Sequence, residues 1–124
     1  MSTRPILVLA LLLAACAPPA AATVAVPVTV TAGPVCPVVT DPPDPSCDDR
    51  PVAGAELIVR GPDGRTVTTV RSDDAGHATL QLAPGSYVLV PQPVEGLMGT
   101  AEEMTIVVTD DPEPITVGYD TGIR

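Results

Sequence analysis

Proline and glycine interrupt this sequence so often that a helical fold is excluded. The chain of 124 residues contains 16 Pro and 10 Gly, and both residue types are disfavoured inside helices. The segments between them are short and rich in Val, Ile and Thr, which favour strands. Because 45% of the residues are apolar, the chain is not expected to be disordered. The sequence therefore predicts one small domain built from strands.

Seven segments have the composition or the alternation of a strand. Segment 77–82 is the clearest, because Ala78, Leu80 and Leu82 alternate with polar residues and so share one face. Turn residues separate the segments at a spacing of roughly eight to twelve residues, which is typical of a β-sandwich. We therefore expect an all-β fold, an antiparallel β-sandwich of about seven strands, at 26–31, 55–60, 65–72, 77–82, 87–91, 104–109 and 115–119.

The predicted core is built from small aliphatic side chains, because the sequence contains neither Phe nor Trp. A core of this kind is modest in a domain of about 100 residues, so a crosslink is expected to contribute noticeably to stability. Pro27 lacks a backbone N–H and is expected to place the start of the first strand at a sheet edge. The predicted core residues are Val30, Leu57, Val59, Val67, Leu80, Leu82, Leu89, Ile106, Val108, Ile115 and Val117.

The beginning of the chain has the pattern of an export signal. Residues 6–15 form an apolar run that follows Arg4, and the run is too short for a membrane span, which needs about 20 residues. It ends in Leu-Ala-Ala followed by Cys16, a sequence that resembles a bacterial lipobox. The alternative is an ordinary secretory signal that is cut near residues 20–22, so that Cys16 is discarded.

The lipobox resemblance implies a division of the chain and a location. Residues 1–15 would be a lipoprotein signal peptide, 16–23 a tether lipidated at Cys16, and 24–124 the β-sandwich domain. Acyl chains such as palmitate would then hold the protein on the outer face of the bacterial cell membrane without spanning it. The formal charge of -9 would be repelled by anionic headgroups, so deep contact with the membrane is not expected.

The two remaining cysteines predict a disulfide bond. Cys36 and Cys47 enclose a loop with four prolines, and an even number of cysteines in an exported chain indicates a disulfide. Closing a loop of this length stabilises a fold by about 3 kcal/mol. A metal pair is the alternative, but two thiols without a nearby His are poor zinc ligands.

Several turn motifs resemble those of a known family. They are Pro51-Val52-Ala53-Gly54-Ala55, Gly64, Asp73-Asp74-Ala75-Gly76 and Ala83-Pro84-Gly85-Ser86-Tyr87. Over residues 51–90 the chain resembles the carboxypeptidase-regulatory-like domain, a transthyretin-like (prealbumin-like) β-sandwich. This resemblance implies an accessory, adhesive or stabilising module.

The chain also looks similar to collagen-adhesin B-type repeats. Those repeats commonly contain a Lys–Asn isopeptide bond, which is excluded here because the sequence has neither Lys nor Asn; the disulfide would supply comparable rigidity. Residues 33–37, the proline-rich loop 36–47 and residues 119–124 resemble a pattern of small exported actinobacterial proteins.

Few residues are candidates for catalysis. His77 is the one His of the sequence and follows Asp73 and Asp74, so it could act in a small hydrolase or at a metal; the favoured interpretation is a polar residue on the exposed face of a strand. No Ser lies in a Gly-x-Ser-x-Gly motif. We therefore expect no enzyme and no cofactor, and the acidic composition argues against nucleic-acid binding.

Paired acidic residues raise the question of calcium. Two pairs could supply the six to eight oxygens that Ca²⁺ prefers if their loops met, whereas solvated turn carboxylates are the favoured interpretation. The sequence has no Asp-x-Asp-x-Asp-Gly loop, so no metal site is expected. The pairs are Asp48-Asp49, Asp73-Asp74, Glu102-Glu103 and Asp110-Asp111.

One loop is a candidate for partner contact. Leu97 and Met98 lie between two glycines and Glu95 precedes the first of them; the two apolar side chains would form an adaptable contact surface if exposed. The alternative is that both tuck beneath the loop and cover the core. The sequence thus favours a non-catalytic binding or structural module at the cell envelope, with an unidentified envelope or cell-wall partner.

Overall fold

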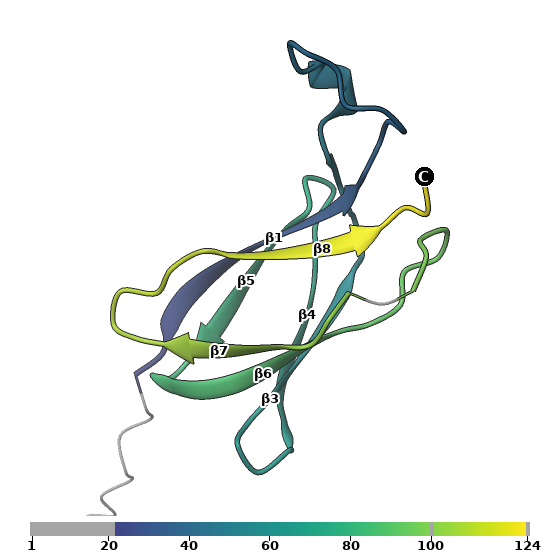
Figure 1. Ribbon diagram of the computed structural model, residues 1–124. Helices are drawn as coiled ribbons and strands as arrows, with labels where there is room; N and C mark the ends of the chain where they lie inside the picture. The colour runs from purple at the N-terminus through teal and green to yellow at the C-terminus, as the bar shows by residue number, and fades with distance from the viewer. Residues whose placement is uncertain (1–21, 100, 124) are drawn as a thin grey trace, which may run out of the picture.

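Strand β1 (Val24–Gly33) is the centre of the first of two sheets that lie face to face (Figure 1). In the computed structural model, which describes residues 22–99 and 101–123, β1 pairs along both of its flanks. Antiparallel strands β5 (His77–Leu82) and β2 (Arg50–Pro51) share one flank, and β8 (Ile115–Asp120) lies parallel to β1 on the other.

The second sheet has four antiparallel strands in the order β4, β3, β6, β7. Their bounds are Thr66–Arg71 for β4, Glu56–Arg60 for β3, Gly85–Pro91 for β6 and Met104–Val108 for β7. A 3₁₀ turn at Pro45–Cys47 is the helical element of the described chain. Within residues 22–99 and 101–123, no helix is long and apolar enough to cross a membrane.

The prediction of an all-β sandwich is confirmed, and each of the seven expected segments forms a strand. Two features were not expected: the two-residue strand β2, and the parallel pairing of β8 with β1. The parallel pairing arises because β7 ends where β1 begins, so the chain crosses there to the first sheet and continues in the direction of β1. Pro27 precedes the first residue of β1 that pairs with β8, which agrees with an open flank at that point.

Aliphatic side chains from both sheets fill the space between them. Val26, Val28, Val30 and Ala32 of β1 are at most 1% exposed, because alternate residues of a strand point to the same face. The expected core residues are buried, apart from half-buried Ile115 and exposed Val67. The other buried members of the core are Val52, Ala55, Leu57, Val59, Leu80, Leu82, Leu89, Ile106, Val108, Val117 and Tyr119.

The prediction that Val67 belongs to the core is wrong, because its side chain is 52% exposed. The ladder of β4 with β3 pairs Thr68 with Val59 but Thr66 with Arg60, so Val67 is the extra residue of a bulge. Val70, which lies opposite Leu57, packs against the core instead. The alternation along β4 therefore turns Val67 to the outer face.

The turn between β4 and β5 needs a glycine. Gly76 has φ +76°, and a Cβ built on it would lie 2.5 Å from the backbone oxygen of Val30. The backbone oxygen of Gly76 accepts a hydrogen bond from the N–H of Val30 at 2.7 Å. Asp73 closes the same turn by accepting hydrogen bonds from the backbone N–H groups of Ala75 and His77. Because Gly76 touches the central strand, a side chain cannot be accommodated by a local shift.

Replacing Gly76 by Ala is expected to destabilise the fold more than replacing Gly64 by Ala. Both glycines have positive φ, so both variants carry backbone strain of about 1 kcal/mol. Only Gly76→Ala adds a clash, since nothing lies within 4 Å of a Cβ built on Gly64. The free energy of unfolding, measured with urea, should therefore fall further for Gly76→Ala. Equal losses in the two variants would contradict the close approach to Val30.

Candidate binding surface

The two ends of the sandwich differ in what they present. Residues 34–49 form a loop that projects from one end, and the first described residues enter β1 at the opposite end (Figure 1). The turn 72–76, the loop 92–99 and the last residues after β8 lie at the same end as the projecting loop, because the strand directions bring them there. We call residues 34–49 the clipped loop.

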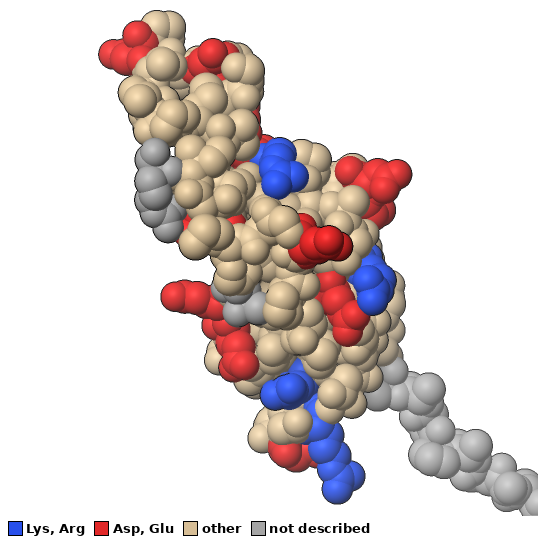
Figure 2. Space-filling model, turned by 90° about the vertical axis from the view of Figure 1, so that its right-hand side faces the viewer, with Lys and Arg blue, Asp and Glu red and all other residues tan. Residues whose placement is uncertain are grey.

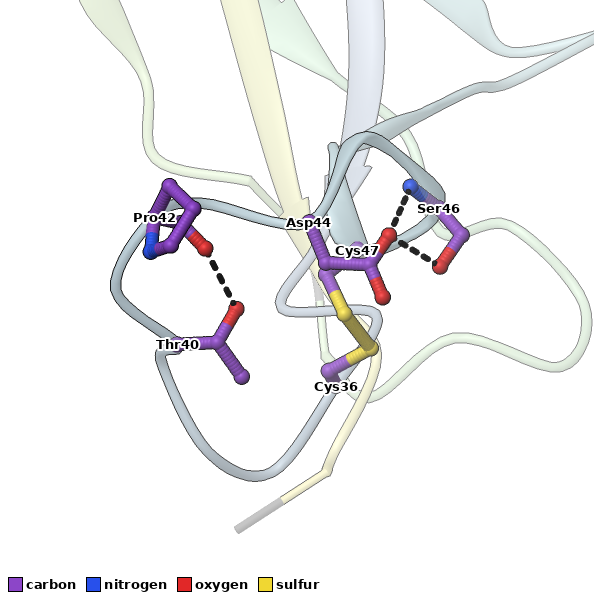
Figure 3. The surroundings of a disulfide bond; sticks show 6 residues. All are labelled: Cys36, Thr40, Pro42, Asp44, Ser46 and Cys47. Carbon is purple, nitrogen blue, oxygen red and sulfur yellow. Dashed lines mark hydrogen bonds between the residues drawn. A yellow bond between two sulfur atoms is a disulfide. The ribbon is translucent and has the colours of Figure 1, made fainter.

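The predicted disulfide between Cys36 and Cys47 is confirmed, and it closes the clipped loop with a Cα–Cα distance of 5.2 Å (Figure 3). Next to it, the carboxylate of Asp44 caps the 3₁₀ turn by accepting hydrogen bonds from the Ser46 backbone N–H at 2.9 Å and from its hydroxyl at 2.8 Å. The bond from the Ser46 backbone N–H, aided by the hydroxyl, holds the pKa of Asp44 below its ordinary value. The loop is thus ordered by covalent and polar contacts and not by burial.

Apolar side chains stand exposed on the clipped loop. The side chain of Val39 is 93% exposed and that of Val38 is 68% exposed. Both line a hollow of about 240 Å³ between the two arms of the loop. The sequence analysis missed this surface, although an adjacent pair of valines inside a proline-rich, crosslinked loop was a usable signal.

The loop that was expected to contact a partner lies at the same end of the sandwich as the clipped loop. Leu97 is half-buried against the core, whereas Met98 is 60% exposed and Glu95 is exposed. Leu97 therefore fits the alternative in which the side chain covers the core, and Met98 fits the alternative in which it forms an exposed contact surface. The backbone N–H of Met98 donates to the oxygen of Asp120 at 2.9 Å, which ties this loop to the end of β8.

The segment after β8 joins the two loops. The backbone N–H of Thr121 donates to the oxygen of Gly33 at 3.2 Å, and its hydroxyl donates to the oxygen of Pro34. Met98 packs over Gly122: the Sδ of Met98 lies 2.6 Å from the position that a Cβ on Gly122 would occupy. The segment after β8 therefore holds both the clipped loop, which carries Val38 and Val39, and the loop that carries Met98.

The candidate catalytic residues are not brought together in the described part of the chain. His77 is exposed at the start of β5, and its backbone, not its imidazole, is bonded to Asp73. The hydroxyl of Ser72 is buried between the backbone oxygen of Val52, to which it donates, and the N–H of Ala55, from which it accepts. Ser72 therefore holds the strand end in place.

The acidic pairs divide between the two ends of the sandwich. Asp48-Asp49, Asp73-Asp74 and Glu102-Glu103 flank strand ends on the side of the clipped loop, whereas Asp110-Asp111 follows β7 at the other end. Among residues 22–99 and 101–123, no three His, Cys, Asp or Glu side chains are grouped closely enough to hold a metal ion. A hollow of about 350 Å³ beside Asp111 is lined mainly by apolar and proline residues, among them Val26, Ile106, Pro112 and Pro114.

Comparison with known proteins identifies the fold and no family. No family model and no curated protein sequence matches the chain. The minor pilin GBS52 of Streptococcus agalactiae matches with a TM-score of 0.59 and 16% identity over 81% of this chain and 45% of that one. A mutant of the shaft pilin spaA of Lactobacillus rhamnosus GG matches with a TM-score of 0.58 and 12% identity, over 79% and 50%.

A third structure, the TIE protein of Bacillus anthracis, has a TM-score of 0.54 and 19% identity, over 78% of this chain and 17% of that one. The chain thus spans half or less of the length of these three structures. At such low identity the likeness shows the β-sandwich fold. The closer resemblance to the carboxypeptidase-regulatory-like family stays a prediction.

Removing the disulfide is expected to loosen the clipped loop while leaving the sandwich folded. No residue of the loop belongs to the core. Without the disulfide, the loop therefore gains conformational freedom in the folded state as well as in the unfolded state. The free energy of unfolding of Cys36→Ser/Cys47→Ser should therefore fall by less than the about 3 kcal/mol of the chain-entropy estimate. Urea unfolding measures this loss, and hydrogen exchange should show faster exchange in residues 36–48. A loss of the whole cooperative transition would contradict the separation of loop and core.

Alkaline pH is expected to weaken the fold through Tyr119. Burial raises the pKa of its phenol, whose hydroxyl donates to the backbone oxygen of Gln92 at 2.6 Å. The folded state therefore disfavours the phenolate, so this contribution to stability is complete below the ordinary tyrosine pKa of about 10 and is lost as the pH rises above it. Unfolding with urea at pH 8 and at about pH 10.5 should show a smaller loss of stability for Tyr119→Phe than for the natural chain. An identical loss in both would contradict this role.

Proposed function

We propose that the chain is an exported lipoprotein whose β-sandwich acts as a non-catalytic binding or structural module at the bacterial cell envelope. In this proposal residues 1–15 are the signal peptide, Cys16 carries the lipid, 16–23 are the tether, and the sandwich projects from the outer face of the membrane. The clipped loop and the exposed Met98 then meet the partner, an envelope or cell-wall protein.

The direction of the chain is the observation that carries this proposal. The described chain enters β1 at the end opposite the clipped loop (Figure 1), so a lipid before residue 22 would point the clipped loop away from the membrane. The exposed Val38 and Val39 are then free to meet a protein. A minor pilin and a shaft pilin share the fold, and this likeness supports a structural or adhesive role.

The distribution of charge supports the same orientation. Figure 2 shows acidic side chains at the tip of the clipped loop and others over the body of the molecule, whereas the arginines visible in this view lie on the body alone. Asp41, Asp44, Asp48 and Asp49 all belong to this loop. Anionic headgroups repel such a loop, so a tethered domain would hold it away from the bilayer.

Mass spectrometry of the chain purified from its own membranes tests the proposal. We expect Cys16 to be the first residue and to carry a diacylglyceryl group. In detergent phase partition, we expect the natural chain in the detergent phase and Cys16→Ala in the aqueous phase. The Cys36→Ser/Cys47→Ser variant is the matched control and should partition like the natural chain, because those thiols carry no lipid. An unmodified Cys16, or a mature chain that begins near residue 21, would overturn the anchoring.

A further inference from the structure

The outer face of the second sheet exposes aliphatic side chains among its threonines and its Arg71–Glu56 ion pair. Antiparallel sheets that face solvent on one side commonly carry polar residues there. Here the outward positions include half-buried Ile58 and Val88, together with Val67 and Val107, which are 52% and 69% exposed. The register places Val88 opposite both Arg60 and Thr105, so these side chains form a row across the sheet. This outer face has the composition of a contact surface.

A cation without a partner lies within this face. Arg60 is exposed, and within residues 22–99 and 101–123 it forms no ion pair, whereas Arg71 is paired with Glu56 at 2.7 Å. Arg60 lies between Thr66 and Val88 across the sheet, and an exposed arginine in such a place can bind a carboxylate while its stem packs on an aliphatic neighbour. The face therefore fits a surface that is both apolar and acidic.

The clipped loop has this complementary composition. Val38 and Val39 are the two exposed valines of the loop, and Asp41 and Asp48 are exposed beside them. The disulfide and the capped 3₁₀ turn order the loop before any contact forms, which lowers the entropic cost of binding. Both surfaces thus expose aliphatic side chains, and the negative charge of the loop is opposite to the positive charge of Arg60.

We propose that the clipped loop of one copy of this chain docks on the outer face of the second sheet of another copy. Val38 and Val39 pack on Val67, Ile58 and Val88, and the loop carboxylates face Arg60. The surface used on one copy differs from the surface used on the next, so the contact is heterologous and can repeat along a row of molecules. This inference deepens the proposed function by naming a second copy of the chain as the partner of the clipped loop; it rests on the binding role proposed for that loop and not on the lipid.

Sedimentation velocity of the mature chain tests the inference, in detergent when the chain is lipidated and in buffer when it is not. We expect the average mass to rise with protein concentration. Val39→Ser, which removes a side chain that supports nothing in the fold, should weaken association by about tenfold. A chain that stays monomeric at every concentration would overturn the inference.

Exchange of charges identifies the two surfaces. Arg60→Asp and Asp41→Arg each place like charges across the contact, so each variant alone should associate at least about tenfold more weakly. A mixture of the two variants should associate again, because the reversed loop of one meets the reversed face of the other. Asp110→Arg matches the charge change of Asp41→Arg, and Thr79→Asp/Gln81→Asp, at exposed positions of β5 in the other sheet, matches that of Arg60→Asp. Both controls lie away from the contact and should leave association unchanged. No recovery in the mixture, or equal weakening by the control variants, would overturn the assignment of these surfaces.

Discussion

Pairing along both flanks of β1 is the constraint on which the fold depends. Val28 and Thr29 each pair with β5 on one side and β8 on the other, so residues far apart in the sequence meet at this strand. The same strand places Val26, Val28, Val30 and Ala32 in the core. A core without Phe or Trp relies on close packing of small aliphatic groups, and close packing requires the two sheets to be held in a fixed register. Gly76 contributes directly, because only a residue without a Cβ can approach the backbone of β1 so closely.

Order in the clipped loop has a different physical origin from order in the sandwich. The sandwich is held by buried apolar area and by strand pairing, whereas the loop is held by a disulfide, by the cap of Asp44 and by its contact with Thr121. Because these two kinds of order are separate, the loop can expose Val38 and Val39 without weakening the core. This separation is what allows a small domain to present a preorganised apolar surface.

Most of the strand positions could be predicted, because their signals are local. Alternation in 77–82 defines β5 without reference to any other part of the chain, and the turn chemistry around Gly76 and Gly64 marks the ends of the neighbouring strands. The disulfide could be predicted because two cysteines remain once Cys16 is assigned to the lipobox. In the candidate site the same local reasoning fell short: it located the loop of Leu97 and Met98 but overlooked Val38 and Val39, since the sequence alone does not show that the clipped loop projects from the body.

The sequence by itself determined that the chain forms short strands, where its turns fall, and which two cysteines are joined, because composition, period and covalent pairing act over a few residues. Only the tertiary structure decided that β8 runs parallel to β1, that Val67 faces outward at a bulge, and that Met98 is exposed while Leu97 packs inward. Each of these outcomes depends on how distant segments register against each other. The place of Arg60, which forms no ion pair within the described residues, became visible for the same reason, since its neighbours Thr66 and Val88 lie on other strands.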